Sequence, residues 1–210
     1  MRKCSNNFFQ TMQQFSSIAV FSINIIISIS YLVLLIKKKI KPALAMWIFF
    51  SLAVSMSLIT YLKEGNYGFW DNALNTADLF MAFFVTLVIF IFGDKSTKFD
   101  SFDIACLGVV VLIIIFWVIT KNHLLTNLGV QLILIIAYIP VIKRMLTANE
   151  NTESFFIWIL LMIAPFISLI SSKGALATVY AVRAIFCTTL LLLLMIRIET
   201  QKRKQASAKK

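Results

Sequence analysis

The sequence is poor in charged residues, glycine and proline. Only 14% of its 210 residues are charged, and it has 6 glycines and 3 prolines, whereas 60% of its residues are hydrophobic. Soluble domains have roughly 25% charged residues, because a folded chain needs polar side chains to cover its surface. The low charge therefore excludes an ordinary water-soluble domain, and the high apolar content excludes a disordered chain. The composition predicts a polytopic membrane protein whose main partner is the lipid bilayer.

Cysteine and histidine are also scarce. The 3 cysteines, Cys4, Cys106 and Cys187, are far apart, and His123 is the single histidine. This number and spacing favour neither a disulfide framework nor a metal site. The chain also lacks a glycine-rich phosphate loop and a His-Glu-x-x-His zinc pattern, and no histidine within an apolar run could activate a nucleophile. We therefore predict a protein that is not an enzyme and that uses no metal or cofactor.

The few charges are mainly positive. Lys and Arg number 20 against 9 Asp and Glu, which gives a net charge of +11. Such an excess can indicate a nucleic-acid partner. Here the basic residues lie between the apolar runs and at the C-terminus, where the positive-inside rule places them in membrane proteins. We therefore expect the charge to set the orientation in the membrane, and we expect no nucleic-acid partner.

Long apolar runs dominate the rest of the chain. A helix needs roughly 20 apolar residues to cross a bilayer, and a helix satisfies its own backbone hydrogen bonds there. We therefore predict an all-α protein with seven transmembrane helices joined by short loops. A polar segment at 1–16 would precede them, and a basic, disordered tail at 197–210 would follow. The predicted spans are residues 17–36, 43–62, 73–92, 103–120, 124–142, 154–171 and 176–196.

The positive-inside rule also gives the chain a direction. With the N-terminus outside, the inner side holds the segments 37–41, 95–98 and 143–144 and the C-terminal tail. Together these contain most of the 20 basic residues. We therefore predict a protein integral to the inner cell membrane, with its N-terminus outside and its C-terminus in the cytoplasm.

One segment of the chain recurs. Residues 47–59 align without a gap with residues 158–170; both begin with Trp-Ile and end with Ser-Leu-Ile. The preceding runs also end alike, because Tyr31 and Tyr138 are each followed by basic residues. A self-similarity of this kind predicts an internal duplication. The predicted parts are a first three-helix repeat, a linker helix that restores a parallel orientation, and a second three-helix repeat, at 17–92, 93–123 and 124–196.

The segments before the two repeated tryptophans carry a family resemblance. Tyr138-Ile-Pro-Val-Ile-Lys-Arg144 precedes Trp158, and Lys37-Lys-Lys-Ile-Lys-Pro42 precedes Trp47. With the 3+1+3 arrangement, the chain resembles the PQ-loop superfamily over about residues 17–196, and in particular its bacterial SWEET-like proteins. The resemblance implies two parallel repeats, a solute site near the membrane midplane and transport by alternating access. The Pro-Gln pair of that family is Pro140-Val141 here, so sugar specificity does not carry over.

Five polar residues inside the apolar runs are the candidate solute-binding residues. Charges at membrane depth are costly and mark a function or a buried pair. Asp78 and Arg183 lie at similar depth in the third and seventh runs, where they could form a solute site or a structural salt bridge. Asn24 and Gln131 occupy equivalent positions in the first and fifth runs, and Asn75 lies one turn before Asp78. Ser28 and Tyr180 are further candidates nearby. For the amides, interhelical hydrogen bonding is the structural alternative.

The family resemblance gives some of these residues a role. SWEET transporters place asparagine side chains from their third and seventh helices around the solute. The resemblance therefore assigns Asn75 or Asp78 to the first of these positions and Arg183 to the second. An arginine in place of an amide favours an anionic or carboxylate-bearing solute, unless Asp78 already neutralises it.

Two tryptophans and two prolines are candidates for gating or for stacking on a solute: Trp47, Trp158, Pro140 and Pro165. Both tryptophans lie about one turn from the predicted inner boundary, where an aromatic belt at the membrane surface is the alternative explanation. SWEET-type transporters use proline hinges in both repeats, whereas only the second repeat of this chain has prolines within its runs.

The sequence thus predicts a facilitative transporter of a small polar solute. The alternative is a non-transporting membrane scaffold or sensor with the same fold, which would use the polar residues structurally. Because both repeats lie in one chain, the transport path needs no second copy of the protein.

Overall fold

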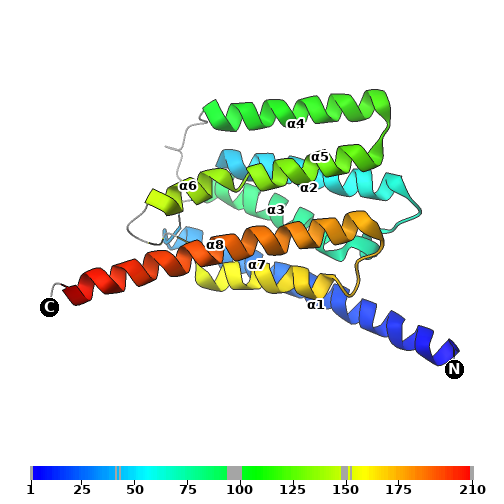
Figure 1. The fold of residues 1–210 in the computed structure, drawn as a ribbon, viewed down its shortest axis with the longest axis horizontal. Helices are drawn as coiled ribbons and strands as arrows, with labels where there is room; N and C mark the ends of the chain where they lie inside the picture. Colours follow the sequence, from blue (N-terminus) through cyan, green and yellow to red (C-terminus); the bar gives the residue numbers. More distant parts are fainter. Residues whose placement is uncertain are drawn as a thin grey trace.

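A computed structural model describes residues 2–40, 42, 44–93, 101–147, 151 and 153–208 of the chain (Figure 1). The described residues form helices and connecting turns, and they contain no strand, which confirms the prediction of an all-α fold. The helices are α1 (Arg2–Ile36), α2 (Leu44–Glu64), the 3₁₀ helix η1 (Phe69–Asn72), α3 (Ala73–Phe92), α4 (Ser101–Thr120), α5 (His123–Ile136), α6 (Ile139–Thr147), α7 (Phe155–Ser168) and α8 (Gly174–Ala208).

Three helical segments among the described residues are long and apolar enough to cross a membrane. They are Gln10–Ile36, Phe69–Phe92 and Gly174–Lys204. The outer surface of the helices is apolar as well: Phe80, Phe90 and Leu132 are 66%, 67% and 63% exposed. Large apolar side chains of this kind are stable against lipid and costly in water. The fold is therefore compatible with a membrane protein.

The two ends of the chain differ from the prediction. α1 begins at Arg2, so most of the expected polar segment 1–16 is helical. α8 continues to Ala208, where a disordered tail was expected from residue 197. The physical reason is the same at both ends: these segments lack glycine and proline, and Gln, Lys and Arg are good helix formers. Hydropathy marks where a membrane begins, and a helix can continue past that point.

Two of the predicted spans are interrupted. The run at 124–142 is divided into α5 and α6 by a turn at Ala137–Tyr138, and the run at 154–171 is helical only to Ser168. Proline explains the division of the first of these runs, because it has no N–H to donate and disfavours helical geometry in the residue before it. Pro140 follows the break before α6, and Pro165 lies in the last turn of α7. α5 and α7 each have 14 residues, a length of about 21 Å.

The helices pack in a pattern with internal symmetry. α3 packs against α1 and α2, and α8 packs against α7 and the α5–α6 pair. The contacts between these two groups are reciprocal, since α1 packs on α7 and α2 packs on α5. α4 lies at the edge of the bundle, against α5 and α2 (Figure 1). The first, second and third helices of the two groups therefore make equivalent contacts.

The repeated tryptophans make equivalent contacts too. Trp47 packs edge-on against Tyr31, with ring centroids 5.2 Å apart and an interplanar angle of 71°. Trp158 packs in the same way against Tyr138, at 6.2 Å and 60°. Each pair joins the first and second helices of its group, so the same aromatic contact occurs at corresponding positions of the two halves of the chain.

Candidate functional site

Eight polar side chains meet in the interior between α2, α3, α5 and α8. Each is at most 7% exposed, and we name this group the central polar cluster. It contains four of the five candidate residues from the sequence, which the fold brings together from helices distant in the chain. The members are Ser57, Thr60, Asn75, Asp78, Asn127, Gln131, Tyr180 and Arg183.

Tyr180 separates the two charges of the cluster. Its hydroxyl donates a hydrogen bond to Asp78 Oδ2 at 2.9 Å, and its ring lies under the guanidinium of Arg183, with Cζ 4.5 Å from the ring centroid. Tyr180 and Arg183 are three residues apart and therefore share a face of α8. The structure describes both charged side chains and shows no direct ion pair between them. The structural salt bridge, one of the two alternatives from the sequence, is therefore not formed directly, and each charge has a neutral hydrogen-bond partner.

Gln131 connects α8 to α2. Its Oε1 accepts a hydrogen bond from Arg183 Nε at 3.0 Å. Its Nε2 donates to Ser57 Oγ at 2.9 Å and to Asn127 Oδ1 at 3.1 Å. One amide therefore hydrogen-bonds both the buried guanidinium on α8 and a hydroxyl on α2. Gln131 thus links the two helix groups where they meet.

Two asparagines complete the contact with α2. Asn127 Nδ2 donates to the carbonyl of Ser57 at 2.8 Å and to Thr60 Oγ1 at 2.9 Å. The Asn75 amide is best satisfied with its oxygen toward α2, where it accepts from Ser57 Oγ at 2.8 Å and its nitrogen donates to the carbonyl of Val54 at 3.2 Å. Ser57 is therefore the residue at which α2, α3 and α5 are hydrogen-bonded to one another.

Within the described part of the chain, the other sequence candidates make no hydrogen bond to this cluster. Asn24 is buried in α1; its Nδ2 donates to the carbonyl of Val20 at 3.1 Å, and its Oδ1 has no partner. Trp47 Nε1 is likewise buried without a partner, whereas Trp158 Nε1 donates to Glu153 at 3.2 Å. Pro140 lies in the first turn of α6. Pro165 is buried in α7, which packs mainly against α8 and α1.

Sequence reasoning missed three members of the cluster: Ser57, Thr60 and Asn127. Asn127 could have been found, since it lies one turn before Gln131 and therefore on the same face of α5. Ser57 also gave a signal, because it is one of the positions shared by the two repeated segments. Thr60 gave none: its hydroxyl bonds the carbonyl of Met56 in its own helix, as threonine commonly does anywhere in a helix.

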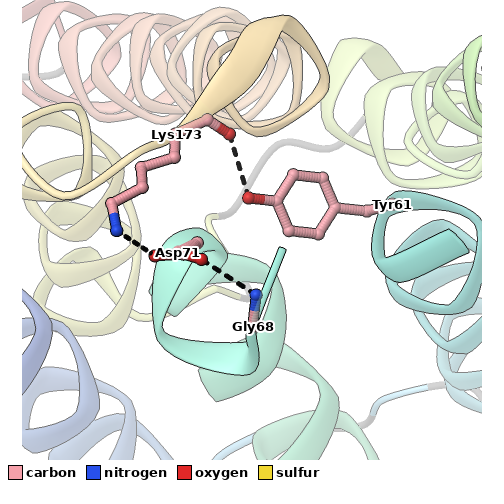
Figure 2. A network of polar contacts seen from close by, with 4 residues as sticks. All are labelled: Tyr61, Gly68, Asp71 and Lys173. Atoms are coloured by element: carbon pink, nitrogen blue, oxygen red, sulfur yellow. Dashed lines mark hydrogen bonds and ion pairs between the residues drawn. The ribbon is translucent and has the colours of Figure 1, made fainter. Parts of the chain in front are cut away.

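A second group of polar contacts, which we name the outer clasp, joins the two helix groups at the end expected to face outward (Figure 2). Lys173, in the turn between α7 and α8, pairs through Nζ with Asp71 Oδ1 of η1 at 2.6 Å. Its backbone N–H donates to the carbonyl of Asp71 at 2.9 Å, and its own carbonyl accepts from the hydroxyl of Tyr61 at 2.9 Å. Asp71 Oδ2 accepts from the N–H of Gly68 at 2.8 Å, which holds η1 in place.

The chemistry of the central cluster suits recognition of a polar solute. Its aspartate can accept hydrogen bonds or carry a proton, its arginine can bind a carboxylate, and its amides can donate and accept. Within the described part of the chain, no group of three or more His, Cys, Asp or Glu side chains could hold a metal ion. Comparison with known proteins adds no relative: no family model, no curated protein and no solved structure matches this chain. The functional argument therefore depends on the geometry of the site.

Proposed function

We propose that this protein is a membrane transporter that moves a small polar solute by alternating access between two three-helix units. The first unit comprises α1, α2 and α3, the second comprises α5 with α6, α7 and α8, and α4 links them. Seven crossings, an outer N-terminus and a cytoplasmic C-terminus are parts of this proposal, as is membership of a SWEET-like family.

The observation that carries the proposal is the central polar cluster. A buried carboxylate and a buried guanidinium lie near the boundary between the units without a direct ion pair. Asp78 belongs to the first unit, and its partner Tyr180 belongs to the second, as do Arg183 and its partner Gln131. In a chain surrounded by lipid, such charges are expensive and are retained for a function. A polar group of a solute can replace the neutral partner of either charge, Tyr180 at Asp78 or Gln131 at Arg183.

The packing supports two related units. α1 with α7 and α2 with α5 form reciprocal contacts, and the Tyr31–Trp47 and Tyr138–Trp158 pairs recur at corresponding positions. Units related in this way can rock about a solute site near the middle of the membrane. The break before Pro140 provides a flexible point in the second unit, and Pro165 removes one backbone hydrogen bond within α7.

The number of crossings depends on the shorter helices. α5 and α6 together extend over residues 123–147, and α2 has 21 residues, so both are long enough to cross. α7 is shorter than a full span, and the turns at 169–171 after its last residue complete the crossing. Thiol labelling of a Ser207→Cys variant, in a chain whose native cysteines are replaced by serine, tests this topology in intact cells, because a cytoplasmic C-terminus is protected from an impermeant reagent.

Solute flux into proteoliposomes tests transport directly. We expect uptake of at least one member of a panel of sugars, amino acids and vitamins, and a loss of about tenfold or more in the Asp78→Asn and Arg183→Gln variants, because each loses the charge that binds the solute. Lys121→Gln is the matched control: this lysine is exposed and lies over Trp117, away from the cluster. Absence of uptake for the whole panel, with normal behaviour of both cluster variants in cells, would contradict the proposal.

One observation favours the alternative, a scaffold or sensor that does not transport. The charges and amides of the central cluster bond mainly to one another, and each residue is at most 7% exposed. A saturated network of this kind can serve to fix helix packing alone. Under this alternative, the two cluster variants lower thermal stability and leave no transport activity to be lost.

A further inference from the structure

A pocket of about 550 Å³ lies beside the outer clasp, between α1, η1 and the turn from α7 to α8. One wall consists of Ile18 and polar residues of α1, and the other carries Trp70, both residues of the Asp71–Lys173 pair and Ser171. No member of the central polar cluster lines it. Its volume suits a small organic solute. The lining of α1 includes Gln10, Gln13, Gln14 and Ser17.

The charges of the pocket favour a ligand that carries both signs. Asp71 and Lys173 are paired with each other, and their side chains are 20% and 49% exposed, so both remain within reach of a solute. A ligand with one charge can take only one of them and leaves the other unpaired. A zwitterion can take both, since its ammonium replaces Lys173 beside Asp71 and its carboxylate replaces Asp71 beside Lys173.

The remaining walls fit the same class of ligand. Trp70 is 64% exposed, and Phe21 supports its ring, with centroids 5.1 Å apart. An open indole face attracts an ammonium group. Ser17 is only 5% exposed, lines the pocket and makes no hydrogen bond among the described residues, so its hydroxyl is available to a ligand. The glutamine amides of α1 can both donate and accept.

We propose that this pocket binds a small zwitterion, which exchanges the Asp71–Lys173 pair for two ion pairs with the ligand. Because the pair joins the two helix groups, this exchange loosens the outer clasp as the ligand binds. That this exchange is the first step of transport rests on the proposed function. The binding of the zwitterion can be measured without any flux. The central cluster also offers two opposite charges, those of Asp78 and Arg183, although these form no direct ion pair.

Calorimetric titration of the full-length protein in lipid nanodiscs tests the binding. The probes are glycine betaine and L-glutamine, which are zwitterions, with choline and 3,3-dimethylbutyrate as analogues of betaine that keep only one charge. We expect at least one zwitterion to bind, and the singly charged analogues to bind about tenfold more weakly or not at all. Equal binding of betaine and its analogues with no binding of glutamine, or no binding of either zwitterion, overturns the proposal.

Substitutions locate the site. Asp71→Asn, Lys173→Gln and Trp70→Ala should each weaken binding of the zwitterion by about tenfold or more. Lys121→Gln and Trp117→Ala are the matched controls, because this second lysine–tryptophan contact lies away from the pocket, on α4 and the residue after it.

Unchanged binding in the three pocket variants overturns the inference even if the protein transports. If a pocket variant does not fold, the comparison of zwitterions with singly charged probes on the unmodified protein still tests whether the protein prefers a zwitterion. Zwitterion binding without any flux leaves this inference standing and contradicts the proposed function.

Discussion

Replacement of Gln131 by leucine is a direct test of the central polar cluster. Gln131 accepts from Arg183 Nε at 3.0 Å and donates to Ser57 Oγ and Asn127 Oδ1 at 2.9 and 3.1 Å. Leucine has a similar volume and no polar atom, so the substitution removes three hydrogen bonds and leaves a buried guanidinium N–H without its acceptor. A hydrogen bond to a charged group contributes about 1.5–3 kcal/mol, and a neutral one between membrane helices about 0.6 kcal/mol. We therefore expect the free energy of unfolding to fall by about 3–4 kcal/mol.

Thermal unfolding of the purified protein in detergent measures this loss. In a chain of this size, 1 kcal/mol corresponds to a change of about 2–4 °C in Tm, so we expect a fall of roughly 6–16 °C. Gln131→Glu should cost less, because it keeps an acceptor for Arg183 and loses only the donors. Leu132→Ala is the control, since this neighbouring side chain is 63% exposed on the outside of α5. A Gln131→Leu protein with the same Tm as the Leu132→Ala control would refute the reasoning.

Three further substitutions test single contacts by the same thermal assay. Tyr180→Phe keeps the ring beneath the guanidinium but removes the hydrogen bond to Asp78, and we expect a loss of about 1.5–3 kcal/mol; adding Asp78→Asn to this variant should then cost little. Gly174→Ala should destabilise the turn by about 1–3 kcal/mol, because φ is +78° and the new Cβ would lie 2.5 Å from the Tyr67 hydroxyl; Tyr67→Phe should recover part of that loss. Asn24→Leu should raise stability by about 1 kcal/mol, because Asn24 Oδ1 is buried without a partner, and a fall in Tm would contradict this.

The members of the central cluster were partly predictable from the sequence. Depth along an apolar run was enough to pair Asp78 with Arg183 and to select Gln131, because a polar group inside lipid has to face the protein interior. Asn24 is buried as well, but it makes no hydrogen bond to a member of the cluster. Ser57 could not be selected from composition, since serine and threonine in a helix commonly bond their own backbone, as Ser55 and Thr60 do.

The helix ends were less predictable than the helices. Hydropathy reports which residues suit lipid, whereas the end of a helix depends on backbone geometry. α1 and α8 therefore extend beyond their apolar parts, and the proline at 140 breaks a run that is apolar on both sides. The outer clasp was not predictable, because Asp71 and Lys173 lie in turns distant in sequence, and only the packing of η1 against the turn before α8 brings them together.

The two contacts between the units differ in chemistry, which predicts where the units separate. α2 and α5 are joined by several buried hydrogen bonds, including that of Asn127 to Thr60. α1 and α7 pack largely through apolar side chains, such as Ile27 and Ile157. Among the described residues, the hydrogen bonds at this contact are those of Ser16, whose Oγ lies 2.6 Å from the carbonyl of Ile167 and 3.0 Å from Ser171 Oγ, beside the pocket at the outer clasp. We therefore expect α2 and α5 to stay together as a hinge while α1 and α7 move apart.

Disulfides placed at the two contacts test this expectation in a chain whose native cysteines are replaced by serine. Oxidation of a Ser16→Cys/Ser171→Cys variant should stop flux into proteoliposomes, and a reductant should restore it, because the bond closes the side that has to open. Oxidation of a Thr60→Cys/Asn127→Cys variant should leave flux at the level of its own reduced form, which controls for the lost hydrogen bonds. If the second disulfide blocks flux and the first does not, the hinge lies between α1 and α7, and the buried hydrogen bonds at α2 and α5 have to break in each transport cycle.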